Sequence, residues 1–530
     1  MKKYFNYIAL PAFALGLVAC EPEFDNDITE NQDFYTSGSA DFSSYVSVGN
    51  SLTAGFADGA LYITGQENSY PNIMAQQFAL AGGGSFSQPL VSDNLGGLTL
   101  GGMQITENRF VLATDADGNP GPARLAGTPT TEVSNIVAGP FNNVGVPGAK
   151  SFHLVAPGYG NVAGVATGQA NPYFARFAST ANTTVMAEAL AANPTFFSLW
   201  IGNNDILGFA TSGGAGVDQT GNLDPSTYGS NDITDPNVFA SVYSQEVAAL
   251  TSTGAKGALV NIPDVTSIPF FTTVPSQAIP LDEETAATLN ASFILYNTQV
   301  LPGLASFGVI TAEEAAARQI NFSAGANFIT IQDEDLTDIS AIIQGPPFNL
   351  DPITAATLSQ LRQTTNDDLI PLTTAGVLGT IDEAYVGFLL ANVPNISPEQ
   401  AGLSAIRGVS RPLQDQFVLT TQEQALVTAA QTQYNATIQA LASANGLAFV
   451  DARTALQNVA NGGVAFSGGI LSSQFVTGGA FSLDGVHPTP RGYAFTANAV
   501  INAINSTYGS TIPGVDIGNY ATVTISNDVN

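Results

Sequence analysis

Residues 45–55 read YVSVGNSLTAG, and residues 195–205 read TFFSLWIGNND. Each stretch begins with a short apolar run and ends with a glycine followed by polar residues. Runs of this kind suit strands that are buried on both faces of a parallel sheet. Residues 258–262 and 447–450 form two further apolar runs of similar length. The four runs therefore predict a parallel sheet at the centre of the fold.

Helical patterns lie between these runs. Asp235 followed by Pro236 has the form of an N-cap with proline in the first turn, and apolar residues then recur at near-helical spacing. Residues 427–441 carry apolar or aromatic side chains at spacings of three and four, and Gly446 follows them. Because helices alternate with strands, the pattern predicts an α/β fold with right-handed crossovers.

The composition excludes several classes of protein. The chain has 530 residues, with 43 acidic and 13 basic side chains, and a formal net charge of −30. This acidic balance excludes a cationic surface for nucleic acid and docking on anionic lipid through a basic patch. One cysteine permits no internal disulfide, and two histidines leave little room for a histidine-rich metal site. We therefore expect no metal, no cofactor and no nucleic-acid partner.

The N-terminus has the pattern of a secretory signal. Lys2 and Lys3 precede an apolar run at residues 7–19, which is too short to span a bilayer as a helix. The run ends in Leu-Val-Ala before Cys20, the single cysteine of the chain, and this resembles the lipobox of bacterial lipoproteins. The resemblance implies a signal peptide at residues 1–19 and lipidation of Cys20. A plain signal peptide with an incidental cysteine is the alternative.

The segment after Cys20 is acidic, and residues 20–44 read as a solvated tether. A lipidated cysteine implies a protein of the cell envelope, anchored in the outer membrane of a Gram-negative bacterium and facing the periplasm or the exterior. The lipid anchor is then the expected contact with the membrane, since multiple acyl chains hold a protein stably.

We expect one domain at residues 45–508, with insertions at about 56–140 and 266–420, and a C-terminal tail at 509–530. The insertions are too long to be structureless loops in a compact domain. Within the first insertion, residues 115–119 (DADGN) resemble a fragment of a calcium loop but lack its later ligands. A surface turn is the preferred interpretation of that fragment.

Four short motifs supply polar groups that could carry chemistry. Ser51 follows the first predicted strand on a glycine turn, and Asn204 follows another; open α/β sheets bind ligands at such strand ends. Residues 142–149 (NNVGVPGA) form a glycine-rich turn that could present a backbone N–H group. Asp484 and His487 lie three residues apart, so one loop could supply both an imidazole base and the carboxylate that orients it.

Taken together, the order of these motifs resembles the SGNH, or GDSL-type, hydrolase family. The resemblance implies a three-layer α/β/α sandwich with a parallel sheet of about five strands. It implies a catalytic triad of Ser51, His487 and Asp484, and an oxyanion hole formed by Ser51, Gly148 and Asn204. The expected activity is hydrolysis of an ester, from a lipid or an acylated small molecule or glycan, without a cofactor.

One residue departs from the family pattern, and several alternatives stay open. The first motif usually reads Gly-Asp-Ser, whereas Asn50 stands here before Ser51. His153 is the competing base, although a local packing role is the preferred interpretation. The same fold also hosts carbohydrate O-deacetylases. A non-catalytic surface lipoprotein that binds glycan or lipid is the alternative from a different class.

Overall fold

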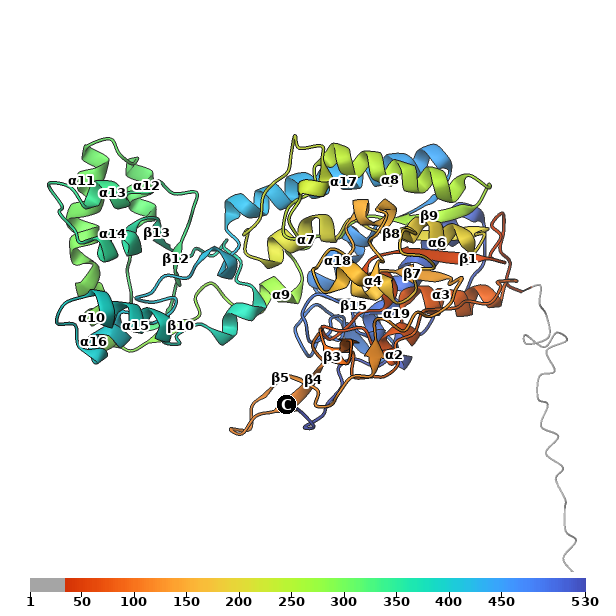
Figure 1. The fold of residues 1–530 in the computed structure, drawn as a ribbon, viewed down its shortest axis with the longest axis horizontal. Coiled ribbons are helices and arrows are strands. Elements are labelled where there is room, and N and C mark those ends of the chain that lie inside the picture. Colours follow the sequence, from red (N-terminus) through yellow and green to blue (C-terminus); the bar gives the residue numbers. More distant parts are fainter. Residues whose placement is uncertain (1–33) are drawn as a thin grey trace, which may run out of the picture.

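The computed structural model of this chain describes residues 34–530 (Figure 1). The predicted signal peptide, Cys20 and the tether as far as residue 33 lie outside the described residues. The described end of the expected tether, residues 34–44, packs against the main body, where Ala40 and Phe42 are buried. In the described part, no helix is both long enough and apolar enough to cross a membrane.

A five-stranded parallel sheet forms the centre of the molecule, in the order β14-β9-β8-β1-β7. The predicted α/β class and the four predicted strands are confirmed. The sequence did not reveal β7, which lies in the motif interpreted as a glycine-rich turn. The strands are β1 (Tyr45–Gly49), β7 (Asn143–Gly145), β8 (Phe196–Trp200), β9 (Lys256–Val260) and β14 (Ala448–Val450).

Long helices flank this sheet. In Figure 1, α8 (Pro236–Thr251) and α17 (Thr421–Asn445) lie together above the sheet, whereas α3 (Tyr70–Ala79) and α19 (Pro490–Tyr508) lie together below it. The predicted caps are present: the Asp235 carboxylate accepts hydrogen bonds from the first turn of α8, and α17 ends at Gly446 with φ +62°. Glycine adopts this left-handed conformation without steric cost.

The main core is rich in aromatic side chains. Phe196 on β8 is fully buried and packs edge-on against Phe42, Phe78 and Tyr508. Phe42 and Phe78 stack with their ring centroids 4.1 Å apart. Since Phe78 lies on α3 and Tyr508 on α19, these contacts fasten both helices to the sheet.

Residues 56–140, expected as an insertion, divide into two parts. Helix α3 belongs to the main core, whereas β4 (Phe110–Thr114) and β5 (Pro120–Arg124) form a projecting hairpin. At the tip of the hairpin, Asp115 accepts hydrogen bonds from the N–H groups of Asp117 and Asn119, so residues 115–119 form a surface turn. The remaining elements before β8 are α1 (Ser51–Ala54), α2 (Ile63–Glu67), β2 (Leu98–Leu100), β3 (Met103–Gln104), β6 (Thr131–Glu132), η1 (Ser151–Val155), α4 (Val162–Val165), α5 (Pro172–Ala175) and α6 (Val185–Ala191).

The C-terminal residues are packed against the rest of the molecule. Leu112 of the hairpin exchanges backbone hydrogen bonds with Thr524 and Ser526, and Leu125 pairs with Val529. The end of the predicted tail, residues 524–530, therefore extends along the hairpin, whereas Ile512 and Ile517 are buried in the main core. Other elements of the main body are α7 (Asn204–Thr211), η2 (Pro225–Thr227), α9 (Pro269–Thr272), α18 (Ala452–Ala460), β15 (Val464–Phe466), β16 (Gly469–Leu471) and η6 (Ile517–Asn519).

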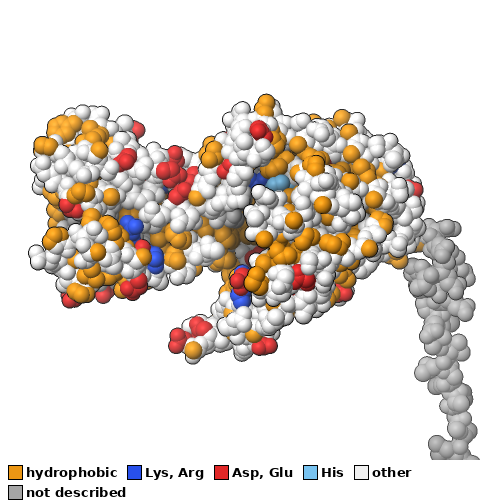
Figure 2. Space-filling view, in the orientation of Figure 1, with side chains coloured by type: hydrophobic (Ala, Val, Ile, Leu, Met, Phe, Trp, Pro, Cys, Tyr) orange, Lys and Arg blue, Asp and Glu red, His pale blue; other side chains and the backbone are white. Residues whose placement is uncertain are grey.

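Residues 274–418 form a separate subdomain with its own apolar core, seen on the left of Figure 1; we call it the insertion subdomain. Inside it, Arg362 forms ion pairs with Asp333 and Asp368. Figure 2 shows that this face of the molecule carries few lysines and arginines. The elements are β10 (Ile279–Leu281), α10 (Glu283–Leu295), η3 (Tyr296–Val300), α11 (Leu301–Ser306), α12 (Ala312–Ala317), β11 (Gly325–Asn327), β12 (Thr330–Gln332), α13 (Ser340–Ile343), α14 (Pro352–Leu358), β13 (Leu361–Gln363), η4 (Leu372–Gly376), α15 (Glu383–Asn392), α16 (Pro398–Leu403) and η5 (Asp415–Phe417).

The aromatic core predicts the effect of truncating Phe196. We expect Phe196→Ala to lower the free energy of unfolding by about 3–5 kcal/mol, because it leaves a cavity between the sheet and two helices. Urea denaturation measures this change. The matched control is Phe34→Ala, at a ring that is 60% exposed, where we expect a change within about 0.5 kcal/mol. Equal effects of the two substitutions would contradict the prediction.

Candidate active site

Ser51 lies at the carboxyl edge of the sheet because the chain turns sharply after β1. Gly49 ends the strand, and a Cβ atom there would collide with the Trp200 carbonyl and the Thr53 hydroxyl. Ser51 is the first residue of α1 and is 6% exposed. The N–H groups in the first turn of a helix have no partner within the helix. The turn therefore presents both the hydroxyl and the N–H group of Ser51 at the end of the strand.

Asn50, the departure from the family pattern, is a buried N-cap. Its Oδ1 accepts a hydrogen bond of 3.0 Å from the N–H of Leu52, and its Nδ2 donates one of 3.3 Å to Oδ1 of Asn203. The amide thus caps α1 as a carboxylate would, and also donates a bond that a carboxylate could not. This second bond ties the turn after β1 to the turn after β8.

The structure brings Ser51, His487 and Asp484 together. Nε2 of His487 lies 2.8 Å from Oγ of Ser51, and its Nδ1 lies 2.9 Å from Oδ2 of Asp484. Since a carboxylate only accepts, the hydrogen between these two groups belongs to Nδ1. Nε2 is then free to accept the Ser51 proton, which is the arrangement of a serine nucleophile with its base.

Hydrogen bonds hold the Asp484 carboxylate in place. Oδ1 accepts from the N–H groups of Val486 and His487 and from the Ser482 hydroxyl, and Oδ2 accepts from the N–H of Gly59. Burial acts to raise the pKa of Asp484, but the charge and hydrogen bonds of His487 and the Val486 N–H outweigh it and lower the pKa to about 2. Asp484 is therefore ionised at neutral pH.

Asp58 supports this loop, and sequence reasoning missed it. Its N–H donates to Oγ of Ser482, and its carboxylate accepts from the Leu483 N–H at 3.0 Å and the Tyr62 hydroxyl at 2.8 Å. Burial, with a contribution from the charge of Asp484, raises the pKa of Asp58 to about 6. Asp58 stands alone in a segment without a recognisable motif, so the sequence offered no signal for it.

Of the expected oxyanion donors, Asn204 lines the same cavity as Ser51, whereas Gly148 lines another. Asn204 begins α7 and lines the same cavity as Ser51; one hydrogen of its Nδ2 is donated to the Ala149 carbonyl at 2.9 Å. Its second amide hydrogen can serve a ligand. Gly148 has φ +81° and lines a different cavity together with His153. The structure therefore connects the Gly148 turn to Asn204 through Ala149, but does not place Gly148 in the lining around Ser51.

Asp205 fixes the turn that contains Gly148. Its buried carboxylate accepts hydrogen bonds from the N–H of Ser151 at 2.8 Å and from the Ser151 hydroxyl at 2.7 Å. Lys150 is also buried and donates to the carbonyls of Gly229 and Asp232. The Asp205 bonds join the segment after β7 to the start of α7, and the Lys150 bonds join it to the loop before α8.

His153, the competing base, has a local role. Its Nδ1 accepts a hydrogen bond of 3.1 Å from the N–H of Lys150, and its ring stacks on Tyr159 with centroids 4.4 Å apart. Burial, together with the charge of Lys150, lowers the pKa of His153 to about 4. Of the two histidines, both of which the structure describes, His487 is the one that contacts Ser51.

An apolar cavity of about 110 Å³ opens beside Ser51 and His487. It lies at the carboxyl ends of the strands, between the sheet and helices α18 and α19. Aliphatic and aromatic side chains dominate its wall, including Leu52, Leu207, Val265, Ile268, Leu456, Val459, Phe481 and Phe495. Such a wall suits a hydrocarbon group rather than a sugar ring.

Comparison of the chain with protein-family models, with curated proteins and with solved structures finds no match. The resemblance to SGNH hydrolases therefore depends on the motifs and on the geometry of this site.

The raised pKa of Asp58 predicts a pH-dependent stability. A rise from 3.8 to about 6 corresponds to about 3 kcal/mol. The folded state binds the carboxyl proton of Asp58 more tightly than the unfolded state does. This proton therefore stabilises the fold fully below about pH 4, and the stabilisation is lost as the pH rises past 6. We expect the unfolding free energy of the native chain, minus that of Asp58→Asn, to fall by up to about 3 kcal/mol between pH 4 and 7.

Urea denaturation at several pH values measures this difference. Asp117→Asn, at an exposed hairpin position, is the matched control and should follow the native chain throughout. If the difference between the native chain and Asp58→Asn were constant with pH, the assignment to Asp58 would be wrong.

Proposed function

We propose that this chain is a serine hydrolase, and more particularly an esterase or lipase of the SGNH type. The observation that carries the proposal is the hydrogen-bonded chain from Ser51 through His487 to Asp484 at the carboxyl edge of the sheet. Helices on both sides of a five-stranded parallel sheet support the three-layer α/β/α architecture that belongs to this proposal.

The proposed reaction begins with attack of the Ser51 hydroxyl oxygen on the ester carbonyl carbon. His487 takes the hydroxyl proton at Nε2, while the ionised Asp484 orients the ring and stabilises the imidazolium. The N–H group of Ser51 and the amide of Asn204, which line the same cavity, are the proposed donors to the oxyanion. The N–H group of Gly148 is a third donor that the family resemblance alone implies. One such donor contributes roughly a factor of 10²–10³ in rate.

The tetrahedral intermediate then collapses, and His487 gives its proton to the departing alcohol. The acyl group remains on Ser51 as an ester. A water molecule, deprotonated by His487, attacks the carbonyl carbon of this acyl-enzyme. The bond to Oγ of Ser51 then breaks, His487 returns the proton to that oxygen, and the carboxylic acid is released. Every proton transfer in this cycle uses Nε2 of His487, so the proposal needs no cofactor.

The apolar cavity favours an acyl chain over an acetylated sugar as the natural substrate group. An O-deacetylase would need room for one acetyl group and polar contacts for the carbohydrate, whereas the wall here is largely hydrocarbon. A binding lipoprotein would have no need for a base hydrogen-bonded to a serine. We also propose that Cys20 carries a lipid anchor and that the protein is located in the cell envelope. Its binding partner would be the ester substrate.

The direct test of the proposal is ester hydrolysis by active-site variants. We expect Ser51→Ala and His487→Ala each to lower kcat/KM for an aryl ester by about 10⁴-fold or more, because nucleophile and base act as a unit. His153→Ala should keep most of the activity, since that ring lines a different cavity from Ser51 and His487. Full activity in Ser51→Ala, or a loss confined to His153→Ala, would refute the proposed assignment.

The cavity predicts a preference among acyl chains. We expect kcat/KM for aryl esters to rise from acetate to longer chains, since each buried CH₂ contributes about 0.8 kcal/mol. Ala455→Phe should narrow the cavity and lower kcat/KM for long chains while sparing the acetate. Gln457→Phe, at an exposed position on the same helix, is the matched control. A flat chain-length series would count against a hydrocarbon-binding cavity.

A further inference from the structure

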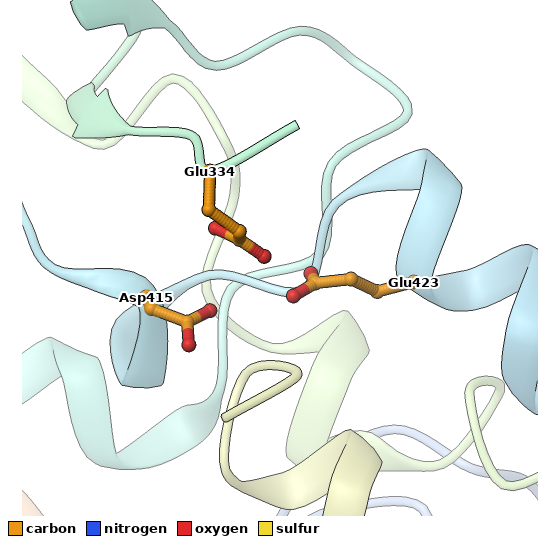
Figure 3. Close-up of side chains that lie close together, drawn as sticks. All are labelled: Glu334, Asp415 and Glu423. Atoms are coloured by element: carbon orange, nitrogen blue, oxygen red, sulfur yellow. The ribbon is translucent and has the colours of Figure 1, made fainter. Parts of the chain in front are cut away.

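Three carboxylates meet where the insertion subdomain joins the main body (Figure 3). Glu334 follows strand β12, Asp415 begins η5, and Glu423 lies in the first turn of α17. One oxygen from each residue lies within 4.8 Å of the others. Figure 3 shows the three side chains pointing toward a common centre. The cluster therefore joins two parts of the molecule that are far apart in sequence.

The structure offers these carboxylates no cationic partner. Among residues 34–530, no lysine, arginine or histidine forms an ion pair with Glu334, Asp415 or Glu423. The nearby Arg362 pairs instead with Asp333, the residue before Glu334, and with Asp368. Within residues 34–530, the cluster therefore has no ion-pair partner.

Glu423 supplies an independent indication of a ligand. The residue is 3% exposed, and one of its oxygens accepts a hydrogen bond of 2.6 Å from the Thr420 N–H. Its other oxygen, Oε1, is buried and has no hydrogen-bond partner. Oδ1 of Asp415 is likewise buried without a hydrogen-bond partner. A buried polar atom without a partner is costly, and a buried charge more so.

The backbone leaves room for this arrangement. Gly214 has φ +88°, and a Cβ atom there would collide with the carboxylate of Glu423. Glycine at this position thus allows the carboxylate to reach the centre of the cluster.

We propose that Glu334, Asp415 and Glu423 bind a calcium ion that fastens the insertion subdomain to helix α17. An oxygen-only donor set favours hard cations over zinc or copper. Two oxygens on opposite sides of Ca²⁺, each at about 2.4 Å, are about 4.8 Å apart. The three carboxylate oxygens lie within 4.8 Å of one another, so they are close enough to share one ion. Water completes the coordination, since Ca²⁺ takes six to eight ligands.

The ion would connect the subdomain to the wall of the cavity beside Ser51. Further along α17, Asn435 accepts a hydrogen bond of 2.8 Å from the N–H of Ile262 and donates one of 2.9 Å to its carbonyl. Pro263, the next residue, lines that cavity. A fixed start of α17 therefore contributes to the position of this segment. The proposal itself is independent of the hydrolase reaction.

The test uses the full chain after treatment with EDTA. We expect isothermal titration with CaCl₂ to give one ion per chain, with Kd of about 10⁻³ M or tighter. Calcium should also raise the Tm of the metal-free protein, because an ion that binds the folded state alone stabilises it. The absence of both heat and Tm shift would overturn the proposal, as would a response to MgCl₂ with none to CaCl₂.

Glu423→Gln is the decisive variant, because glutamine can still serve as the third residue of the helix cap with Thr420. We expect it to bind no calcium, to show no Tm shift, and to have a Tm in EDTA at least as high as that of the native chain. Asp117→Asn, in the exposed turn that resembles a calcium loop, should retain binding and the Tm shift. Retained binding in Glu423→Gln, or loss of binding in Asp117→Asn, would place the ion elsewhere.

Discussion

The parallel register of β1 with its neighbours is the constraint on which the site depends. Gly49 pairs with Trp200 on one side and with Gly145 on the other, so three strands end at the same level. The residues that follow them, which include Ser51 and Asn204, must then lie along one edge of the sheet. The hydrogen bond between Asn50 and Asn203 joins two of these turns directly. A slip of one residue in this register would turn the buried side chains of β1 to the opposite face.

The proposed base, His487, lies at the same edge of the sheet although it is 436 residues from Ser51 in the sequence. His487 belongs to a loop between β16 and α19, and the Asp484 carboxylate holds that loop through four bonds besides the one to the imidazole. One of these comes from Gly59, eight residues after Ser51, so the segment that carries the nucleophile also fastens the acid. This reciprocal attachment gives the proposed catalytic group a fixed geometry, which a general base requires.

Those parts of the fold that depend on local pattern were predictable, and those that depend on distant packing were not. The strands β1, β8, β9 and β14 are apolar runs bounded by turn residues, and α8 and α17 have recognisable caps. Strand β7 has three residues between polar and glycine-rich flanks, so it has no periodicity to detect. The residues of the proposed triad could be predicted because they lie in short motifs whose order resembles that of the SGNH hydrolases. Asp58 and the carboxylates around Glu423 carry no such motif, because their neighbours come from segments that fold together only in three dimensions.

The central claim is that Ser51 is a nucleophile activated by His487. Covalent labelling tests it most directly: a fluorophosphonate probe is incubated with the full chain, and peptide mass spectrometry locates the modified residue. We expect one probe molecule per chain, attached to Oγ of Ser51, because the base at 2.8 Å activates that hydroxyl toward phosphorus as toward an ester carbon. A well-folded chain that takes up no probe, or takes it up on a different residue, contradicts the account.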